Sequence, residues 1–257
     1  MPAEVMALLI CRDEYPTISL QEELARLDAL AQPLCAAADK SPEVQAQCIA
    51  SYIYDKLGFH GNEQEFYDPR NSYLCEVVTR RSGIPITLAV LLMGLGRRAG
   101  IAVEGIGFPG HFLIRVGGED GVLVDPFYGG QVLTSEALHR LATRFLGSPS
   151  QLRKEHLVPV GVHSIAVRML INLKHVYERR GDHARSLVIC DRLVDLTASS
   201  SFRRDRGLHA LALGAAQAAA ADFEAYLGAC PRASDASTIQ IALRRANAAG
   251  NSPVAFQ

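Results

Sequence analysis

Residues 71–130 decide the fold, and they read NSYLCEVVTRRSGIPITLAVLLMGLGRRAGIAVEGIGFPGHFLIRVGGEDGVLVDPFYGG. Almost every residue of the segment 86–95 is apolar, so this segment has no polar face. A short helix that is apolar on all sides is normally buried in a core, and the run is shorter than the roughly 20 residues of a membrane span. We therefore expect a buried central helix that begins at Pro85, a residue suited to a first helical turn.

A β-hairpin follows the expected central helix. Two short apolar runs, HFLIRV and VLVD, flank the glycine-rich sequence of residues 117–121, which is a typical hairpin pattern. If Val116 pairs with Val122, His111 and Asp125 become diagonal neighbours on one face, with Cα atoms about 7–8 Å apart. A change of register by one residue would place the two side chains on opposite faces. Their meeting therefore depends on this register.

A histidine oriented by a carboxylate, facing the start of a buried helix, is the layout of a Cys-His-Asp catalytic site. The free amides at a helix start stabilise anions, which suits a nucleophile or an oxyanion. Gly110 and the glycines before it leave the strand edge bare, so a ligand can approach the backbone there. Arg115 shares the face of His111 if the strand alternates, and it is either an anion-binding residue or a solvated one. His111 and Asp125 have structural alternatives, as a histidine bonded to backbone and as a strand-ending Asx turn.

Four motifs resemble the SirB-one family of transglutaminase-like proteins with C-terminal tetratricopeptide repeats: NSYL at 71–74, RSGIPITL at 81–88, GIGFPGHFL at 105–113 and DPFYGG at 125–130. The resemblance covers roughly residues 15–247. It implies an α+β fold, with a transglutaminase-like (papain-like) core that carries a small antiparallel sheet, followed by an all-α tetratricopeptide-like region. It also implies that His111 and Asp125 match two members of the catalytic triad.

The third member of the triad is missing. In active transglutaminase-like enzymes a cysteine opens the central helix, eleven residues before an arginine and fourteen before a glycine. Counting back from Arg97 and Gly100 reaches Ile86. The resemblance therefore implies a protein without the catalytic thiol, which acts as a binding or regulatory protein through its His-Asp cleft and its helical repeats.

Two other functions stay open at this point, and so does whether the protein is an enzyme. A hydrolase or acyl transferase would need a relocated nucleophile, either Cys75 or Thr87. Against these roles, a hydroxyl at a helix start commonly bonds to backbone, and a buried thiol is usually inert. The third alternative is a scaffold that contacts its partners through the repeats alone.

The loop of residues 59–70 precedes the central motifs and is a lid over the site or a surface connector. Asn71 follows it directly, where an N-cap of the next helix is the first interpretation and a side chain lining the site is the second. A capping box at Ser19 and a Ser-Pro-Glu start at Ser41 predict two supporting helices earlier in the chain. Residues 5–10 fit a short helix or an edge strand.

The second half of the chain is helical. A helix is expected at 133–146, and a linker at 147–161 gives a first domain of residues 1–150 and a second of 151–257. Five helices are expected in the second domain, at 163–180, 182–197, 203–214, 216–229 and 234–247. Gly181 and Gly214 lie 33 residues apart, close to the repeat length of a tetratricopeptide unit. Two units are fewer than a free solenoid needs, so we expect this region to pack on the first domain.

Composition narrows the function classes. The 257 residues are 49% hydrophobic and carry a net charge of -1, which gives no reason to expect nucleic acid or a membrane as partner. The cysteines are scattered without metal-ligand or disulfide spacing, which favours a cytoplasmic protein: Cys11, Cys35, Cys48, Cys75, Cys190 and Cys230. The histidines show no ligand spacing either. No metal or cofactor is expected, and the partner is an unknown protein or peptide.

Overall fold

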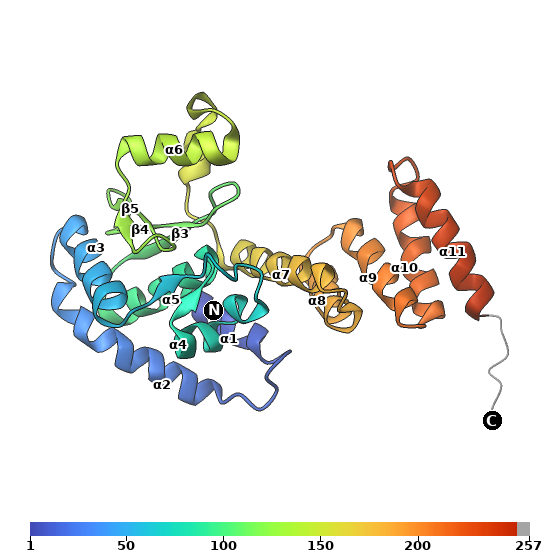
Figure 1. The fold of residues 1–257 in the computed structure, drawn as a ribbon, viewed down its shortest axis with the longest axis horizontal. Coiled ribbons are helices and arrows are strands. Elements are labelled where there is room, and N and C mark those ends of the chain that lie inside the picture. Colours follow the sequence, from blue (N-terminus) through green and yellow to red (C-terminus); the bar gives the residue numbers. More distant parts are fainter. Residues whose placement is uncertain (251–257) are drawn as a thin grey trace. The chain divides into compact units, whose positions relative to one another are not determined.

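The computed structural model of the protein describes residues 1–250 (Figure 1). The chain forms two compact units, Met1–Met169 and Leu170–Gln257. The division between them lies inside the helix α7 (Val162–Arg179) rather than in the linker that precedes it. The functional domains of residues 1–150 and 151–257, and the packing of the second on the first, therefore stay predictions.

The first unit begins with helices. Residues 5–10 belong to a helix and not to an edge strand, and Ser19 caps the second helix by accepting a hydrogen bond of 3.3 Å from the amide of Glu22. The helix predicted from Ser41 is continuous, but its second half is wound as a π-helix. The elements are α1 (Ala3–Cys11), α2 (Leu20–Ala31), the 3-10 helix η1 (Gln32–Ala37), α3 (Pro42–Ala50) and the π-helix η2 (Ser51–Lys56).

The central helix α5 (Pro85–Ala99) is the core of the first unit. It is buried on nearly all sides, as its apolar sequence predicts, and α1, α2 and α4 (Leu74–Arg80) pack against it (Figure 1). Gly94 allows α1 to come close, because a Cβ at this position would lie 2.9 Å from the Cβ of Glu4. The helix ends at Gly100, whose φ of +76° is typical of a left-handed C-cap.

A four-stranded antiparallel sheet follows α5. Its strands are β3 (Val103–Ile106), β4 (Leu113–Val116), β5 (Val122–Asp125) and β6 (Gln131–Val132), in the order β3-β4-β5-β6. The hairpin register is confirmed, because Val116 pairs with Val122. The α+β class with a small antiparallel sheet is confirmed as well. The short strand β6 was not predicted.

The predicted loop 59–70 contains regular structure. Its first residues form β1 (His60–Gly61), which pairs in parallel with β2 (Ser82–Gly83), and its last residues enter the 3-10 helix η3 (Pro69–Ser72). The β1–β2 pair ties the loop to the residues just before α5. The loop is therefore a fixed part of the fold at both of its ends.

The end of the first unit contains α6 (Ser135–Leu146) and two 3-10 helices, η4 (Pro149–Gln151) and η5 (Lys154–Leu157). Just after them, Pro159 forms an isolated bridge with Ile106, and the amide of Val160 donates to the carbonyl of Gly105 at 2.9 Å. The segment after η5 therefore pairs along β3, which would otherwise be a free edge of the sheet.

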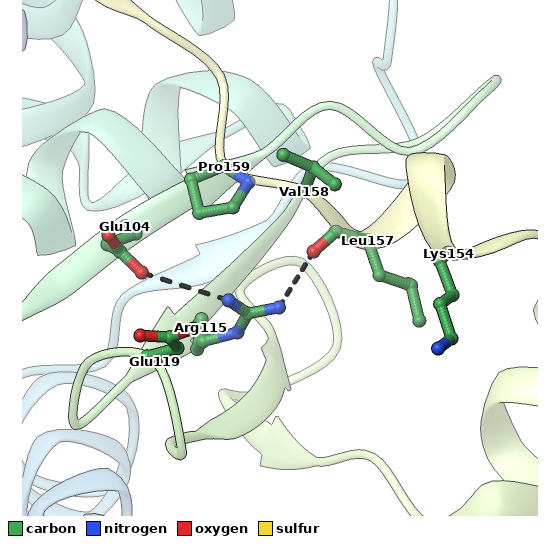
Figure 2. A pocket seen from close by; sticks show the side chains of 7 residues that line it. All are labelled: Glu104, Arg115, Glu119, Lys154, Leu157, Val158 and Pro159. Atoms are coloured by element: carbon green, nitrogen blue, oxygen red, sulfur yellow. Dashed lines mark hydrogen bonds and ion pairs between the residues drawn. The ribbon is translucent and has the colours of Figure 1, made fainter.

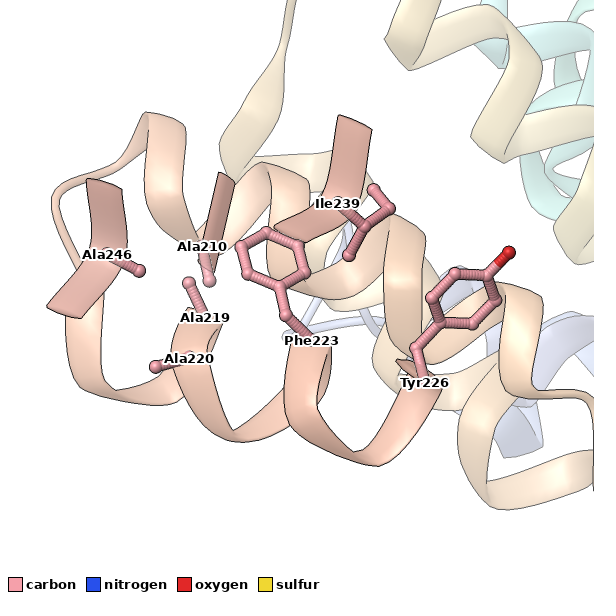
Figure 3. Packing of buried hydrophobic residues seen from close by; sticks show 7 residues of the cluster. All are labelled: Ala210, Ala219, Ala220, Phe223, Tyr226, Ile239 and Ala246. Carbon is pink, nitrogen blue, oxygen red and sulfur yellow. The ribbon is translucent and has the colours of Figure 1, made fainter. Parts of the chain in front are cut away.

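The second unit is all helical, as predicted. After α7 come α8 (His183–Leu196), α9 (Ser200–Ala212), α10 (Ala216–Ala229) and α11 (Ala236–Gly250). Gly181 and Gly214, which predicted the repeat, both have positive φ in the turns between these helices. Figure 3 shows the packed side chains: Ala210, Ala219, Ala220, Phe223, Tyr226, Ile239 and Ala246. Within residues 1–250, no helix is long and apolar enough to cross a membrane.

Candidate functional site

His111 and Asp125 form a buried pair. The Nε2 atom of His111 lies 2.8 Å from Oδ2 of Asp125, and the two residues are 5% and 2% exposed. The other carboxylate oxygen, Oδ1, accepts the amides of Phe127 at 2.9 Å and Tyr128 at 3.3 Å. Since the carboxylate accepts these bonds, the ring donates Nε2–H to it and Nδ1 carries the free lone pair. No described group hydrogen-bonds to Nδ1.

A turn positions His111, and not a strand as the sequence predicted. The amide of His111 donates to the carbonyl of Phe108 at 3.1 Å, and Gly110 adopts a φ of +71° between them. The guanidinium of Arg168 donates to the carbonyl of Phe108 at 2.9 Å and also to that of His111. Arg168 was not predicted as a site residue, because it lies 57 residues away in the chain and no local pattern marks it.

Three aromatic rings hold the imidazole of His111. Phe145 stacks on it, with ring centroids 5.5 Å apart and an interplanar angle of 13°. Tyr128 is also nearly parallel to it, with a centroid distance of 6.2 Å, whereas Phe127 meets it edge-on. Together with Asp125, these contacts fix the orientation of the ring.

A cavity of about 340 Å³ lies beside His111. The N-terminus of α5 and the loop 59–70 both contribute to its wall, as the sequence predicted, whereas Asp125 is not among the lining residues. The lining residues are Glu63, Phe66, Pro85, Gly110, His111, Phe127, Tyr128, Arg144 and Phe145. Sequence reasoning missed Arg144 and Phe145, since both come from α6, where neither is distinguishable from an ordinary surface residue.

Asn71 organises the loop that forms one wall of the cavity. Its Nδ2 donates to the carbonyls of Glu65 at 2.7 Å and Phe66 at 3.3 Å. Its Oδ1 accepts from Nδ2 of Asn62 at 3.1 Å and from Nη1 of Arg80 at 3.3 Å. The N-cap role considered for Asn71 is wrong, because α4 begins later in the chain. Instead, its side chain supplies hydrogen bonds to backbone carbonyls of the loop that are not paired in a strand.

Thr87 lies within the first turn of α5, with its hydroxyl group fully used. The hydroxyl donates to the carbonyl of Asn71 at 2.6 Å and accepts the amide of Ile84 at 3.2 Å. Thr87 is completely buried and does not line the cavity. These contacts connect the loop to the start of α5.

Cys75 lies in α4 and does not line the cavity either. A hydrogen bond with Cys11 and burial both raise the pKa of the Cys75 thiol. A thiol that stays protonated is a weak nucleophile. The described residues that line the cavity include no thiol and no aliphatic hydroxyl.

Arg115 is separated from His111, so the shared face predicted for these residues is wrong. Its Nη2 donates to the carbonyl of Leu157 at 2.8 Å, and Nη1 lies 4.0 Å from the carboxylate of Glu104 (Figure 2). It lines a different cavity of about 570 Å³. The alternation fails because β4 begins only at Leu113, after the turn that carries His111.

The residues described by the structure contain no group of three or more His, Cys, Asp or Glu side chains that could hold a metal ion. The cavity presents several functional side chains. They comprise an oriented imidazole with a free Nδ1, a carboxylate, a phenol, a guanidinium and several aromatic rings. This set has a base and its orienting carboxylate but lacks the nucleophile of a triad.

The chain is similar to known proteins over most of its length. Residues 21–171 match the model of the transglutaminase-like superfamily, and residues 173–244 match a tetratricopeptide-repeat model. A UPF0162 protein of Xylella fastidiosa is 37% identical over 238 residues, which cover 90% of this chain and 85% of that protein. A UPF0162 protein of Vibrio cholerae is 29% identical, over 81% of this chain and 78% of its own length.

A shorter similarity reaches a different kind of protein. F-box only protein 21 of Mus musculus is 38% identical over 89 residues, which are 33% of this chain and 14% of that protein. No solved structure matches the chain.

Proposed function

Because the chain belongs to the transglutaminase-like superfamily, we propose that it is a member without a nucleophile, which binds a peptide or protein in the cavity beside His111. Its assignment to the SirB-one family is part of this proposal. The observation that carries it is the composition of the cavity wall. His111 and Asp125 are in hydrogen-bond contact, but none of the described residues that line the cavity beside His111 carries a thiol or an aliphatic hydroxyl.

The helical repeats support a role in protein binding. Residues 173–244 match a tetratricopeptide model, and helical repeats of this kind present extended binding surfaces. We propose that the second unit contributes a contact surface for the same partner. A scaffold that used the repeats alone would leave the cavity without a role, although its imidazole is held by Asp125 and by stacked rings.

The enzymatic alternatives have less support. Cys75 would need a lowered pKa to act as a nucleophile. Its hydrogen bond with Cys11 and its burial instead raise the pKa of the thiol. Thr87 would need a free hydroxyl facing a base, whereas its hydroxyl bonds to Asn71 and Ile84. Each residue has a structural role where it lies.

Binding in the cavity predicts a selective effect of His111→Ala. Peptides selected from a displayed random library on the purified full chain should lose at least about tenfold in affinity for this variant, which corresponds to about 1.4 kcal/mol. The reason is that the variant removes both the free Nδ1 and a stacked wall of the cavity. Fluorescence anisotropy with labelled peptides measures the change.

The matched control for this experiment is Arg115→Ala, which alters the other cavity and should leave the affinity unchanged. Peptides that bind His111→Ala as tightly as the parent chain would show that binding takes place elsewhere. The parent chain should also release no ammonia from a glutamine peptide offered with a primary amine. Steady turnover in that assay would contradict the proposal directly.

A thiol at position 86 should restore an activated nucleophile. Ile86 lies in the first turn of α5, next to Pro85 in the cavity wall. In Ile86→Cys, the imidazole of His111 should lower the pKa of the introduced thiol by about two units or more from its usual value near 8.5. The pH dependence of iodoacetamide labelling, followed by mass spectrometry of the peptide around position 86, measures this shift.

Adding His111→Ala to Ile86→Cys is the control, and it should return the labelling midpoint to that of a free thiol. Peptide-level detection is necessary because Cys35 is exposed and reacts independently. If both variants label with the same midpoint, position 86 does not face the imidazole, and Ile86 does not occupy the place of the nucleophile.

A further inference from the structure

The cavity beside His111 contains a guanidinium that is already held in place. Nη1 of Arg144 donates to the hydroxyl of Tyr128 at 3.0 Å, and the guanidinium lies 5.2 Å from the ring centroid of Phe145. Because the Tyr128 oxygen accepts this bond, its own proton is free to donate to a ligand. Two donors are therefore positioned at one side of the cavity before any ligand arrives.

The start of α5 borders the same cavity. Pro85 lines it as the first residue of a 15-residue helix. Ile86 and Thr87 follow it in the first turn but do not line the cavity themselves. The helix therefore acts on a ligand there through the positive end of its dipole, which stabilises an anion.

His111 supplies an independent indication of a ligand. It is 5% exposed, it lines the cavity, and its Nδ1 has no partner. Nδ1 is not one of the fully buried atoms that lack a partner, so it is open to the cavity and can form a hydrogen bond with a ligand there.

Glu63 also lines the cavity, and its negative charge opposes the binding of an anion. Its carboxylate lies on the exposed part of the loop, and no hydrogen bond or ion pair of its side chain positions it. Arg144 is exposed as well, but two contacts hold its guanidinium, whereas binding would have to order the side chain of Glu63 at a cost in entropy. The fixed groups of the cavity therefore select for negative charge.

We infer that the cavity binds a carboxylate attached to an aromatic or aliphatic group, such as the C-terminal carboxylate of a peptide. This inference rests on the proposed binding function and names the ligand class for it. The carboxylate lies between Arg144, the Tyr128 hydroxyl and the start of α5. The attached group contacts the rings of Phe66 and Phe127.

Three small probes of similar shape test the charge that the cavity selects. N-acetyl-phenylalanine carries a carboxylate, N-acetyl-phenylalanine amide is its neutral isostere, and phenethylamine presents a cation on the same ring. The carboxylate should bind at least about tenfold more tightly than the amide, since a hydrogen bond to a charged group is stronger than a neutral one. Nuclear magnetic resonance titration of the full chain gives the three dissociation constants.

Arg144→Gln should reduce the preference for the carboxylate over the amide to less than about threefold, since the variant removes the charge and keeps a side chain that can donate. Arg115→Gln is the matched control and should keep the full preference, because Arg115 lines the other cavity. An amide that binds as tightly as the carboxylate, or a tighter cation, overturns the inference.

The same titrations separate this inference from the proposed function. If the selected peptides bind in a manner that depends on His111 but N-acetyl-phenylalanine neither binds nor displaces them, the cavity is a binding site and the carboxylate assignment is wrong. If neither the peptides nor the carboxylate depends on His111, both the assignment and the proposed function are wrong.

Discussion

Replacing Leu91 by alanine should lower the free energy of unfolding of the first unit by about 2–5 kcal/mol. Leu91 lies in the middle of α5 and is 0% exposed. The substitution removes buried methyl groups and leaves a cavity that helices on several sides cannot fill completely. The lost burial of the methyl groups and the cost of the cavity add, because packed interiors relax only partly around a deletion.

Because the chain forms two compact units, the measurement must report on α5 itself. Hydrogen exchange in urea, read by mass spectrometry on peptides from α5, gives the free energy for the first unit. Leu9→Ala is the matched control, because Leu9 lies in α1 of the same unit and is 39% exposed. If Leu91→Ala costs no more than Leu9→Ala, α5 is not the core of this unit.

The burial of α5 was predictable because the signal is local and redundant. A run of residues without a polar face has few alternatives to an interior position, and nearly all of α5 is indeed buried. The helices of the second unit were predictable for a similar reason, since their glycines mark the turns, and both Gly181 and Gly214 have positive φ. In these segments the local pattern and the tertiary structure agree.

The contact between His111 and Asp125 was predictable only through the register of the hairpin. The pairing of Val116 with Val122 is confirmed, and the two side chains do meet. The strand predicted to carry His111, however, begins only at Leu113, two residues later. The turn before it is held by hydrogen bonds from Arg168, which lies 57 residues after His111 in the sequence. No periodicity in the sequence encodes such a contact.

Other parts of the site depend on strand pairs of only two residues or on contacts between residues that are distant in the sequence. The pairing of β1 with β2 involves two residues on each strand, which is too short for an alternation pattern. Asn71 holds the loop through three side-chain hydrogen bonds, although its position next to a helix suggested a cap. Arg144 and Phe145 lie on α6 and reach the cavity only through tertiary structure.

Replacing Glu4 by glutamine should destabilise the first unit by about 3 kcal/mol, near the lower end of the range for breaking a buried ion pair. Glu4 is 1% exposed, and its carboxylate lies 2.6 Å from Arg97 and 2.8 Å from Arg98. Arg98 is itself almost buried and would keep only Asp28, at 2.6 Å, as a charged partner, beside the carbonyl of Gly94 at 2.9 Å. Arg97 is half exposed and can turn to water, which limits the loss.

The same carboxylate makes the stability of the parent chain depend on pH. Burial raises the pKa of Glu4, but hydrogen bonds from Arg97 and Arg98 outweigh it, and the pKa is lowered in the folded state. A group with a lowered folded pKa contributes its full stability above the unfolded pKa, which is about 4.3 for glutamate. This contribution is lost as the pH falls from there through the folded pKa.

The stability difference between the parent chain and Glu4→Gln should therefore be largest near pH 6 and should shrink as the pH falls below about 4. Urea unfolding at a series of pH values, read by hydrogen exchange on peptides from α1 and α5, measures the difference directly. Glu119→Gln is the control, because Glu119 lies in the exposed turn between β4 and β5, away from α1 and the arginines. A difference for Glu4→Gln that stays constant between pH 6 and about pH 3 would mean that the charge of Glu4 does not hold α1 on α5. The attachment of α1 would then depend on apolar packing alone, including the close approach that Gly94 allows.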